Sequence, residues 1–260
     1  MEAWELLIRM VGTAVVVIVI TWAVGALGPV IGGALAGFPI TLGPGFFFLA
    51  IQETPEFFIH AASFALLALC ATQVFLLIYM MAARRFGVVV SIASALAAWF
   101  VLVLGFAALS VPALVGGMAF VVTTLTCRVW GKKYLLPLTT VKRKSRPVLL
   151  ILRGVVAGVL VAVVTSLSEL LGSYISGVLL ASPIGYTVMA ITIHQEFGDR
   201  IVIQTLHAMM IGTVSLGVFC FSLAIGGQYT GQMVAFLIGL VAATGTTAGL
   251  SIRARYRKNT

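Results

Sequence analysis

Two glutamates, each preceded by a glutamine, end two strongly apolar segments of this 260-residue chain. Gln52-Glu53 closes the first segment, and Gln195-Glu196 closes the second. Ionisable groups at such positions of membrane spans are candidates for proton coupling, cation attraction or gating. The alternative interpretation is an interfacial charge that ends a span, and the sequence leaves both interpretations open.

A proline interrupts each of the same two segments, Pro39 in Gly28–Glu53 and Pro183 in Gly172–Glu196. Proline removes a backbone donor and clashes with the carbonyl four residues back, so each helix should bend or open there. Freed carbonyls at membrane depth need protein, water or a ligand as partners. We therefore predict a substrate or ion site where the two broken helices meet, with an ordinary proline kink as the alternative. The predicted site residues are Pro39, Ile40, Thr41, Gly43, Pro44, Ser182, Pro183, Gly185, Tyr186 and Thr187.

No motif for catalysis or metal binding accompanies these residues. The three cysteines lie in or at the ends of apolar runs at unrelated spacing, which is typical of small buried hydrophobes. Histidine can shuttle protons near neutral pH, but His60, His194 and His207 are scattered and form no metal-binding spacing. The sequence therefore predicts no enzyme activity, no cofactor and no metal.

The composition indicates that lipid is the solvent of most of the chain. Hydrophobic residues make up 61% of it, charged residues only 9%, and the mean hydropathy is +1.17. Apolar runs of roughly 20 residues, the length of a membrane-spanning helix, recur from end to end. The net charge of +9 is concentrated between these runs, as the positive-inside rule expects of cytoplasmic loops, and does not indicate nucleic-acid binding.

The apolar runs predict nine helical spans, because a lipid-exposed backbone must satisfy its own hydrogen bonds. With the basic loop and tail in the cytoplasm, nine spans place the N-terminus outside, and of all lysines and arginines only Arg9 then lies toward the outside. Glu2, Glu5, Glu53, Glu56 and Glu169 fall on the outer side as well. We expect a bacterial inner (plasma) membrane protein with a cytoplasmic C-terminus. The spans are roughly 5–27, 28–51, 57–82, 86–107, 110–127, 149–171, 172–194, 200–224 and 229–252.

The two special segments belong to a longer internal repeat. Residues 6–40 align without gaps to 150–184, and fourteen pairs are identical, Pro39-Ile40 with Pro183-Ile184 among them. After one deletion Gln52-Glu53 aligns with Gln195-Glu196. An odd number of spans separates the starts of the two copies, so the second copy enters the membrane from the opposite face. Inverted repeats with interrupted helices are a recurring plan of secondary transporters.

The predicted fold is therefore all-α and integral to the membrane, with about nine helices in two inverted repeats and breaks in helices 2 and 7. Residues 1–108 form the first repeat, and residues 109–148 form a connector helix and a basic cytoplasmic loop. Residues 149–260 form the second, inverted repeat and a basic tail. Small residues at Gly33 and Gly37, and at their mates Gly177 and Ala181, predict close helix packing.

The pattern GGxLAGxPIxxGPxxFFLAxxE resembles small bacterial inner-membrane proteins of the GlpM-like type. It is carried by Gly32-Gly33, Leu35-Ala36-Gly37, Pro39-Ile40, Gly43-Pro44, Phe47-Phe48-Leu49-Ala50 and Glu53. The resemblance covers about a tenth of the chain and implies no substrate. The second copy departs from the pattern at Gly43, Pro44 and the phenylalanine run, which leaves open whether the two halves are functionally equivalent.

Together these features predict a secondary active transporter that moves a small solute or ion by alternating access. Glu53 and Glu196 would provide proton or ion coupling, or gating. The alternatives are a non-transporting membrane subunit of an export or lipid-modifying complex, and a lipid flippase or channel. The expected partners are the lipid bilayer and a small-molecule or ion substrate, with no nucleic acid, and the sequence is compatible with a homodimer.

Overall fold

The computed structural model describes most of the chain outside its N-terminal and central parts. It covers residues 22–24, 26–36, 42–106, 109, 111–137 and 182–259, together with Val11, Val15, Ile18 and Val19. For residues 34, 44 and 254–259 it describes only the backbone. Most of predicted helix 1, the basic loop from residue 138, predicted helix 6 and the first part of predicted helix 7 lie outside this range.

All regular structure in the described ranges is helical. The five helices α4, α5, α6, α10 and α11 are long and apolar enough to cross a membrane, which indicates a membrane location. They correspond to five of the predicted spans. The elements are α2 (Pro29–Leu35), α3 (Leu42–Gln52), α4 (Pro55–Ala83), α5 (Val88–Phe106), α6 (Ala113–Gly131), the 3₁₀ helix η1 (Lys132–Tyr134), α9 (Ile184–Phe197), α10 (Asp199–Tyr229) and α11 (Gln232–Asn259).

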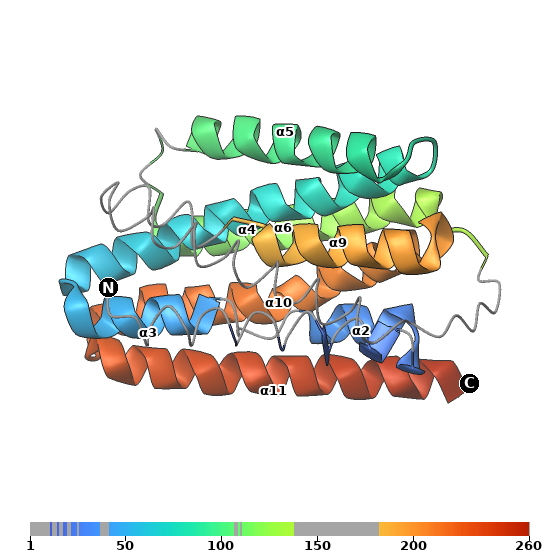
Figure 1. Cartoon of the computed structure of the whole chain (residues 1–260). Helices are drawn as coiled ribbons and strands as arrows, with labels where there is room; N and C mark the ends of the chain where they lie inside the picture. Colours follow the sequence, from blue (N-terminus) through green and yellow to red (C-terminus); the bar gives the residue numbers. More distant parts are fainter. Residues whose placement is uncertain are drawn as a thin grey trace.

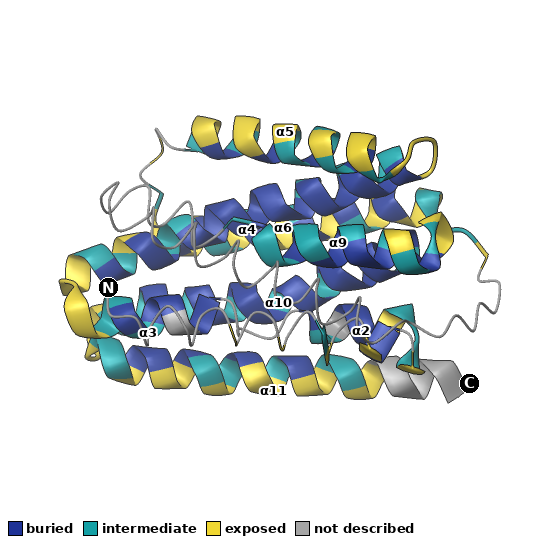
Figure 2. Ribbon diagram, in the orientation of Figure 1, coloured by how far each residue is buried: buried dark blue, intermediate teal, exposed yellow. Residues whose placement is uncertain are grey.

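Helices α4 and α10 form the centre of the bundle, pack against each other and run in opposite directions (Figure 1). Both are largely buried, whereas α5, α6 and α11 expose rows of valine, leucine and isoleucine (Figure 2). Helix α5 covers α4, α11 covers α10, and α6 contacts both central helices. Apolar outer faces around a buried core are what a bundle needs when its surroundings are hydrocarbon.

The two ends of the bundle differ in charge. One end, which we call the Glu53 end, contains the α3–α4 and α10–α11 turns. These two turns are joined by a hydrogen bond of 3.0 Å from the side chain of Gln232 to the carbonyl of Glu53. The opposite end, the Arg84 end, contains the α4–α5 and α9–α10 turns and the end of α6 (Figure 1). Every lysine and arginine whose side chain is described lies toward the Arg84 end: Arg84, Arg85, Arg128, Lys132, Lys133, Arg200 and Arg253.

Helices α2 and α3 lie on either side of the proline-containing segment. Helix α2 ends at Leu35, whose carbonyl is the one that the ring of Pro39 would meet in a continuous helix, and α3 begins at Leu42. With 7 and 11 residues, neither helix alone can cross a hydrocarbon core. In the second half, α9 begins at Ile184, directly after Pro183, and has 14 residues.

Helix α2 approaches α10 very closely at Gly33. A Cβ built on this glycine would lie 2.5 Å from the Cβ of Ala208, 2.7 Å from the carbonyl oxygen of Thr205 and 2.9 Å from the backbone nitrogen of Met209. The small size of Gly33 therefore permits the close helix packing predicted from the sequence. The helix against which it packs is α10. Gly37, Gly177 and Ala181 lie outside the described residues.

Replacing Gly33 with alanine should destabilise the protein, because its methyl group would overlap the backbone of α10. Overpacking of this kind lowers the free energy of unfolding by about 1–3 kcal/mol. Gly245→Ala is the matched control, since Gly245 is exposed in the interior of α11 and no described atom lies within 4 Å of the position of its Cβ. Thermal unfolding in one detergent compares the two variants, and equal midpoints for both would contradict the close approach.

Candidate functional site

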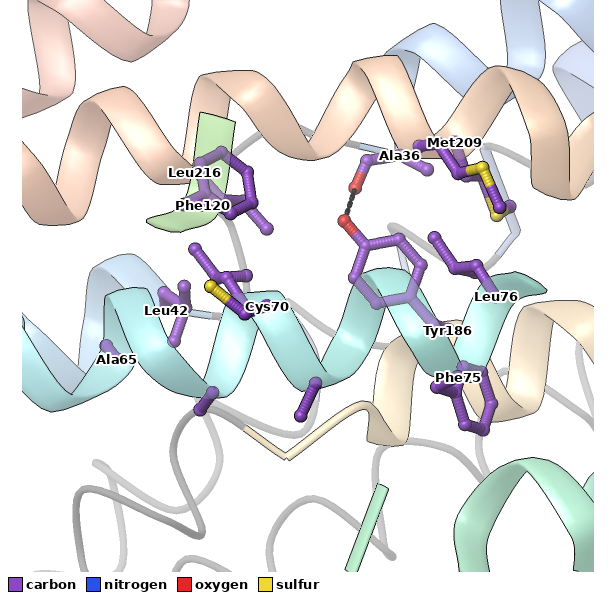
Figure 3. Close-up of a cluster of buried hydrophobic side chains, with 14 of the residues drawn as sticks. Ala36, Leu42, Ala65, Cys70, Phe75, Leu76, Phe120, Tyr186, Met209 and Leu216 are labelled. Atoms are coloured by element: carbon purple, nitrogen blue, oxygen red, sulfur yellow. Dashed lines mark hydrogen bonds between the residues drawn. The ribbon is translucent and has the colours of Figure 1, made fainter. Parts of the chain in front are cut away.

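The two proline-containing segments meet in the interior of the bundle. The hydroxyl of Tyr186, in the first turn of α9, donates to the carbonyl of Ala36, the residue after α2, at 3.3 Å (Figure 3). Tyr186 is only 7% exposed. Ala36 follows the last residue of α2, where helix carbonyls need partners from outside the helix. A hydroxyl from the second half thus caps the end of α2 in the first.

The surroundings of this contact combine an apolar wall with a few polar atoms. Leu76 of α4 and Met209 of α10 belong to the same buried cluster as Tyr186 (Figure 3). One position further along α9, the hydroxyl oxygen of Thr187 is buried and forms no hydrogen bond with any described group. Gly43 is buried in the first turn of α3, yet no described atom would touch a Cβ there.

The remaining predicted site residues are placed as follows. Pro183 is buried at the N-cap of α9, and Ser182 and Gly185 next to it are half-buried. Pro44 is the third residue of α3. Pro39, Ile40 and Thr41 lie outside the described residues. Among the described residues, the hydrogen bond of Tyr186 to Ala36 joins the two segments, and the substrate site itself stays a prediction.

The two predicted carboxylates lie at opposite ends of the bundle. Gln52 and Glu53 are exposed at the Glu53 end, where α3 ends. Gln195 is exposed and Glu196 half-buried at the Arg84 end, where α9 ends. Both carboxylates therefore lie toward the ends of the bundle, where α3 and α9 end (Figure 1).

Helices α3 and α9 both pack on the central helices. Phe46 of α3 packs edge-to-face on Phe58 of α4 and Phe219 of α10, with ring centroids 6.0 and 5.9 Å apart. Helix α9 buries Met189 and Ile193 in the same core, and its His194 ring nitrogen lies 3.2 Å from the hydroxyl of Tyr79 on α4. Aromatic packing thus holds α3, and apolar packing together with polar contacts holds α9.

A buried polar cluster that the sequence analysis missed lies where α4, α6 and α10 meet. The side-chain nitrogen of Gln73 is 2.9 Å from the hydroxyl of Thr124 and 3.1 Å from the carbonyl of Met210, and it also bonds the hydroxyl of Thr213. Gln73 and Thr213 are fully buried. The only signal in the sequence was a lone glutamine inside an apolar run, because its partners stand 51 and 140 residues away.

Comparison of the chain with protein-family models, with curated proteins and with solved structures gives no match. The resemblance to GlpM-like proteins therefore stays a prediction from one local pattern. The function of the protein is therefore inferred from the geometry of the described residues.

Proposed function

We propose that the protein is a secondary active transporter built from two inverted repeats, with its substrate site between the ends of α2 and α3 and the start of α9. A two-fold axis in the membrane plane would make the outward-open and inward-open states near mirror images of each other. The solute would bind at the middle of the bundle, where the half-helices leave backbone groups without helical partners.

The arrangement of the helices supports this proposal. Helices α4 and α10 occupy equivalent positions in the repeat alignment, pack against each other and run in opposite directions. The contacts between the two halves also come in a matched pair. Helix α3 of the first half packs on α11 of the second, and α9 of the second half packs on α5 of the first. If a two-fold axis relates the halves, each of these two contacts requires the other.

The residues at the crossing of α4 and α10 give a second line of support. The alignment that pairs Glu53 with Glu196 carries an offset of 143 residues, which pairs Gln73 with Leu216 and Cys70 with Thr213. Under a two-fold relation, the contact between Gln73 and Thr213 therefore corresponds to a contact between Leu216 and Cys70. These two residues belong to one buried cluster (Figure 3). The axis would then pass through the middle of both central helices.

The observation that carries the proposal is the hydrogen bond from Tyr186 to the carbonyl of Ala36, since it joins the interrupted segments of both halves inside the bundle. Its symmetry mate would involve Leu42 or Gly43, depending on which side of the one-residue deletion the pair lies, and neither residue has a hydroxyl. A substrate site at this point would therefore not be symmetric between the two halves.

The charge distribution favours the orientation expected from the sequence. Described basic side chains gather toward the Arg84 end, whereas Glu53 and Glu56 lie at the opposite end. The positive-inside rule then puts the Arg84 end in the cytoplasm of a bacterial inner membrane. In this orientation Glu53 would stand at the outer mouth of the transporter and Glu196 at the inner mouth.

Alternating access can be tested without knowing the solute. In a background with Cys70, Cys127 and Cys220 replaced by alanine, a single cysteine at Thr187 should react with a membrane-impermeant maleimide in both right-side-out and inside-out vesicles. Thr72→Cys, buried on α4 with its native hydroxyl bonded to its own helix, is the control and should not react in either. Reaction of Thr187→Cys from one side only, or from neither, would contradict alternating access.

The same assay tests the role of the two glutamates. If their carboxylates gate or couple the two mouths, the ratio of outer to inner labelling of Thr187→Cys should change with pH in the parent protein. The double replacement Glu53→Gln and Glu196→Gln should abolish this change, because an amide does not titrate in this range. A ratio that depends on pH equally in both proteins would show that the glutamates only end their spans.

A further inference from the structure

The Arg84 end carries four cations on two neighbouring turns that the proposed transport does not use. Arg84 and Arg85 lie in the α4–α5 turn, Lys132 and Lys133 lie in η1, and all four side chains are exposed. The guanidinium of Arg84 donates to the carbonyl of Lys133 at 3.3 Å, which holds the α4–α5 turn beside η1. We call these four residues the cationic patch.

The backbone on which the two lysines lie is fixed by packing. A Cβ built on Gly131, directly before η1, would lie 3.1 Å from the ring of His207 on α10 and 3.5 Å from the end of Met80 on α4. After η1, the carbonyl of Leu136 accepts a hydrogen bond of 2.7 Å from the side chain of Gln204 on α10. The lysines therefore belong to a short connection that is held on both sides, while their side chains stay exposed.

The surrounding sequence supplies no carboxylate that could neutralise the patch. From Phe57 to Ser168 the chain contains ten of its 16 lysines and arginines and no aspartate or glutamate. The described carboxylates at this end, Glu196 and Asp199, belong to the α9–α10 turn, next to the cation of Arg200. Positive charge therefore accumulates where the α4–α5 turn meets η1, and it favours an anionic partner.

Exposed apolar and aromatic side chains border the patch. Phe86 and Val89 lie at the start of α5, Val129 and Trp130 lie in the last turn of α6, and each is more than half exposed. Cations beside an exposed tryptophan at the end of a span are typical of the headgroup level of a bilayer. A free anion would use the charges and not these apolar side chains, whereas an amphiphile with an anionic head uses both.

We propose that the cationic patch binds the head group of an anionic phospholipid, with the phosphate between the α4–α5 turn and η1 and the acyl chains along the exposed ends of α5 and α6. Guanidinium and ammonium groups both donate charge-assisted hydrogen bonds to phosphate oxygens. A cation close to a membrane surface increases the affinity for anionic lipid by about fivefold. In the proposed orientation the lipid belongs to the cytoplasmic leaflet.

A lipid can bind at this end of the bundle whether or not the protein transports a solute, so the lipid site and the proposed function stand separately. The positive-inside rule treats all cations at one end alike. A lipid site instead requires the cations of the patch and not Arg253, which lies toward the same end on α11. Helices α11 and α5 lie on opposite sides of the bundle (Figure 1).

Lipid binding can be tested on the purified full-length protein in a non-ionic detergent by thermal unfolding. The additions are phosphatidylglycerol, phosphatidylcholine with the same acyl chains, and inorganic phosphate at the same concentration. A ligand that binds the folded state raises the unfolding midpoint in a saturable way. We expect this from phosphatidylglycerol, and no comparable rise from the zwitterionic lipid or from inorganic phosphate.

The double replacement Lys132→Gln and Lys133→Gln should raise the phosphatidylglycerol concentration for half of the effect by about tenfold or more, because two cations are lost. Lys132→Arg with Lys133→Arg keeps both charges and should keep the parent response. If the double glutamine variant does not fold, Lys133→Gln alone decides the question, with an expected loss of about fivefold.

Arg253→Gln is the matched control for Lys133→Gln, because it removes one exposed cation from the same end of the bundle. It should leave the response to phosphatidylglycerol unchanged. Equal losses in Lys133→Gln and Arg253→Gln would show that only the overall charge of this end attracts the lipid, and would overturn the proposal. Equal midpoints in phosphatidylglycerol and phosphatidylcholine, or an equal rise with inorganic phosphate, would overturn it as well.

Discussion

Replacing Tyr186 with alanine should cause one of the two largest losses of stability in this protein. The change removes a ring that is 7% exposed, and it leaves the carbonyl of Ala36 without its partner. Truncating a buried aromatic side chain to alanine lowers the free energy of unfolding by about 3–5 kcal/mol. Denaturant unfolding of the protein in detergent micelles measures the loss.

Tyr186→Phe separates the hydrogen bond from the packing. Phenylalanine keeps the ring and deletes the hydroxyl, so the expected loss is that of an unpaired buried carbonyl, about 1–3 kcal/mol. A phenylalanine variant as stable as the parent would show that the Ala36 carbonyl finds another partner, and the contact between the two half-helices would then lose its importance for the site.

Replacing Phe46 with alanine should produce the second large effect. Its ring is 1% exposed and contacts Phe58 and Phe219 edge-to-face, and Phe219 in turn contacts Phe236 of α11 with centroids 6.0 Å apart. Packing, not removal from water, drives helix association in lipid, so we expect the lower part of the range for such truncations, about 3 kcal/mol. Phe100→Ala, on a ring that is 55% exposed on α5, is the control and should change the free energy of unfolding by less than about 0.5 kcal/mol.

The Phe46 replacement also bears on the transport proposal. The aromatic cluster of Phe46, Phe58, Phe219 and Phe236 lies toward the Glu53 end of the bundle, which is the outer end in the proposed orientation. Loosening it should favour the outward-open state and increase outer labelling of Thr187→Cys relative to inner labelling. Loss of stability without any change in this ratio would make the cluster a packing feature unrelated to access.

The sequence predicted the helices of the described region well, because hydropathy and charge are local properties. Spans expected at 57–82 and 200–224 correspond to α4 and α10. The break expected at Pro39 falls on residues outside the described range, between the end of α2 at Leu35 and the start of α3 at Leu42, and stays a prediction.

Long-range polar contacts could not be predicted in the same way. Tyr186 was among the candidate site residues, but its partner is a backbone carbonyl, and a carbonyl has no signature in a sequence. Gln73 was overlooked because a single amide in an apolar helix shows no periodicity, and its threonine partners belong to two other helices. Such pairs become visible only when the packing of α4, α6 and α10 is known.

The opposite insertion of the two halves is the central claim, and cysteine labelling of one aligned pair of residues tests it most directly. Glu56 and Asp199 match in the repeat and are exposed at the starts of α4 and α10. In the background without native cysteines, we predict that Glu56→Cys reacts with an impermeant maleimide only from the periplasmic side and Asp199→Cys only from the cytoplasmic side. Reaction of both cysteines from the same side would contradict the inverted arrangement, and the transport mechanism that depends on it.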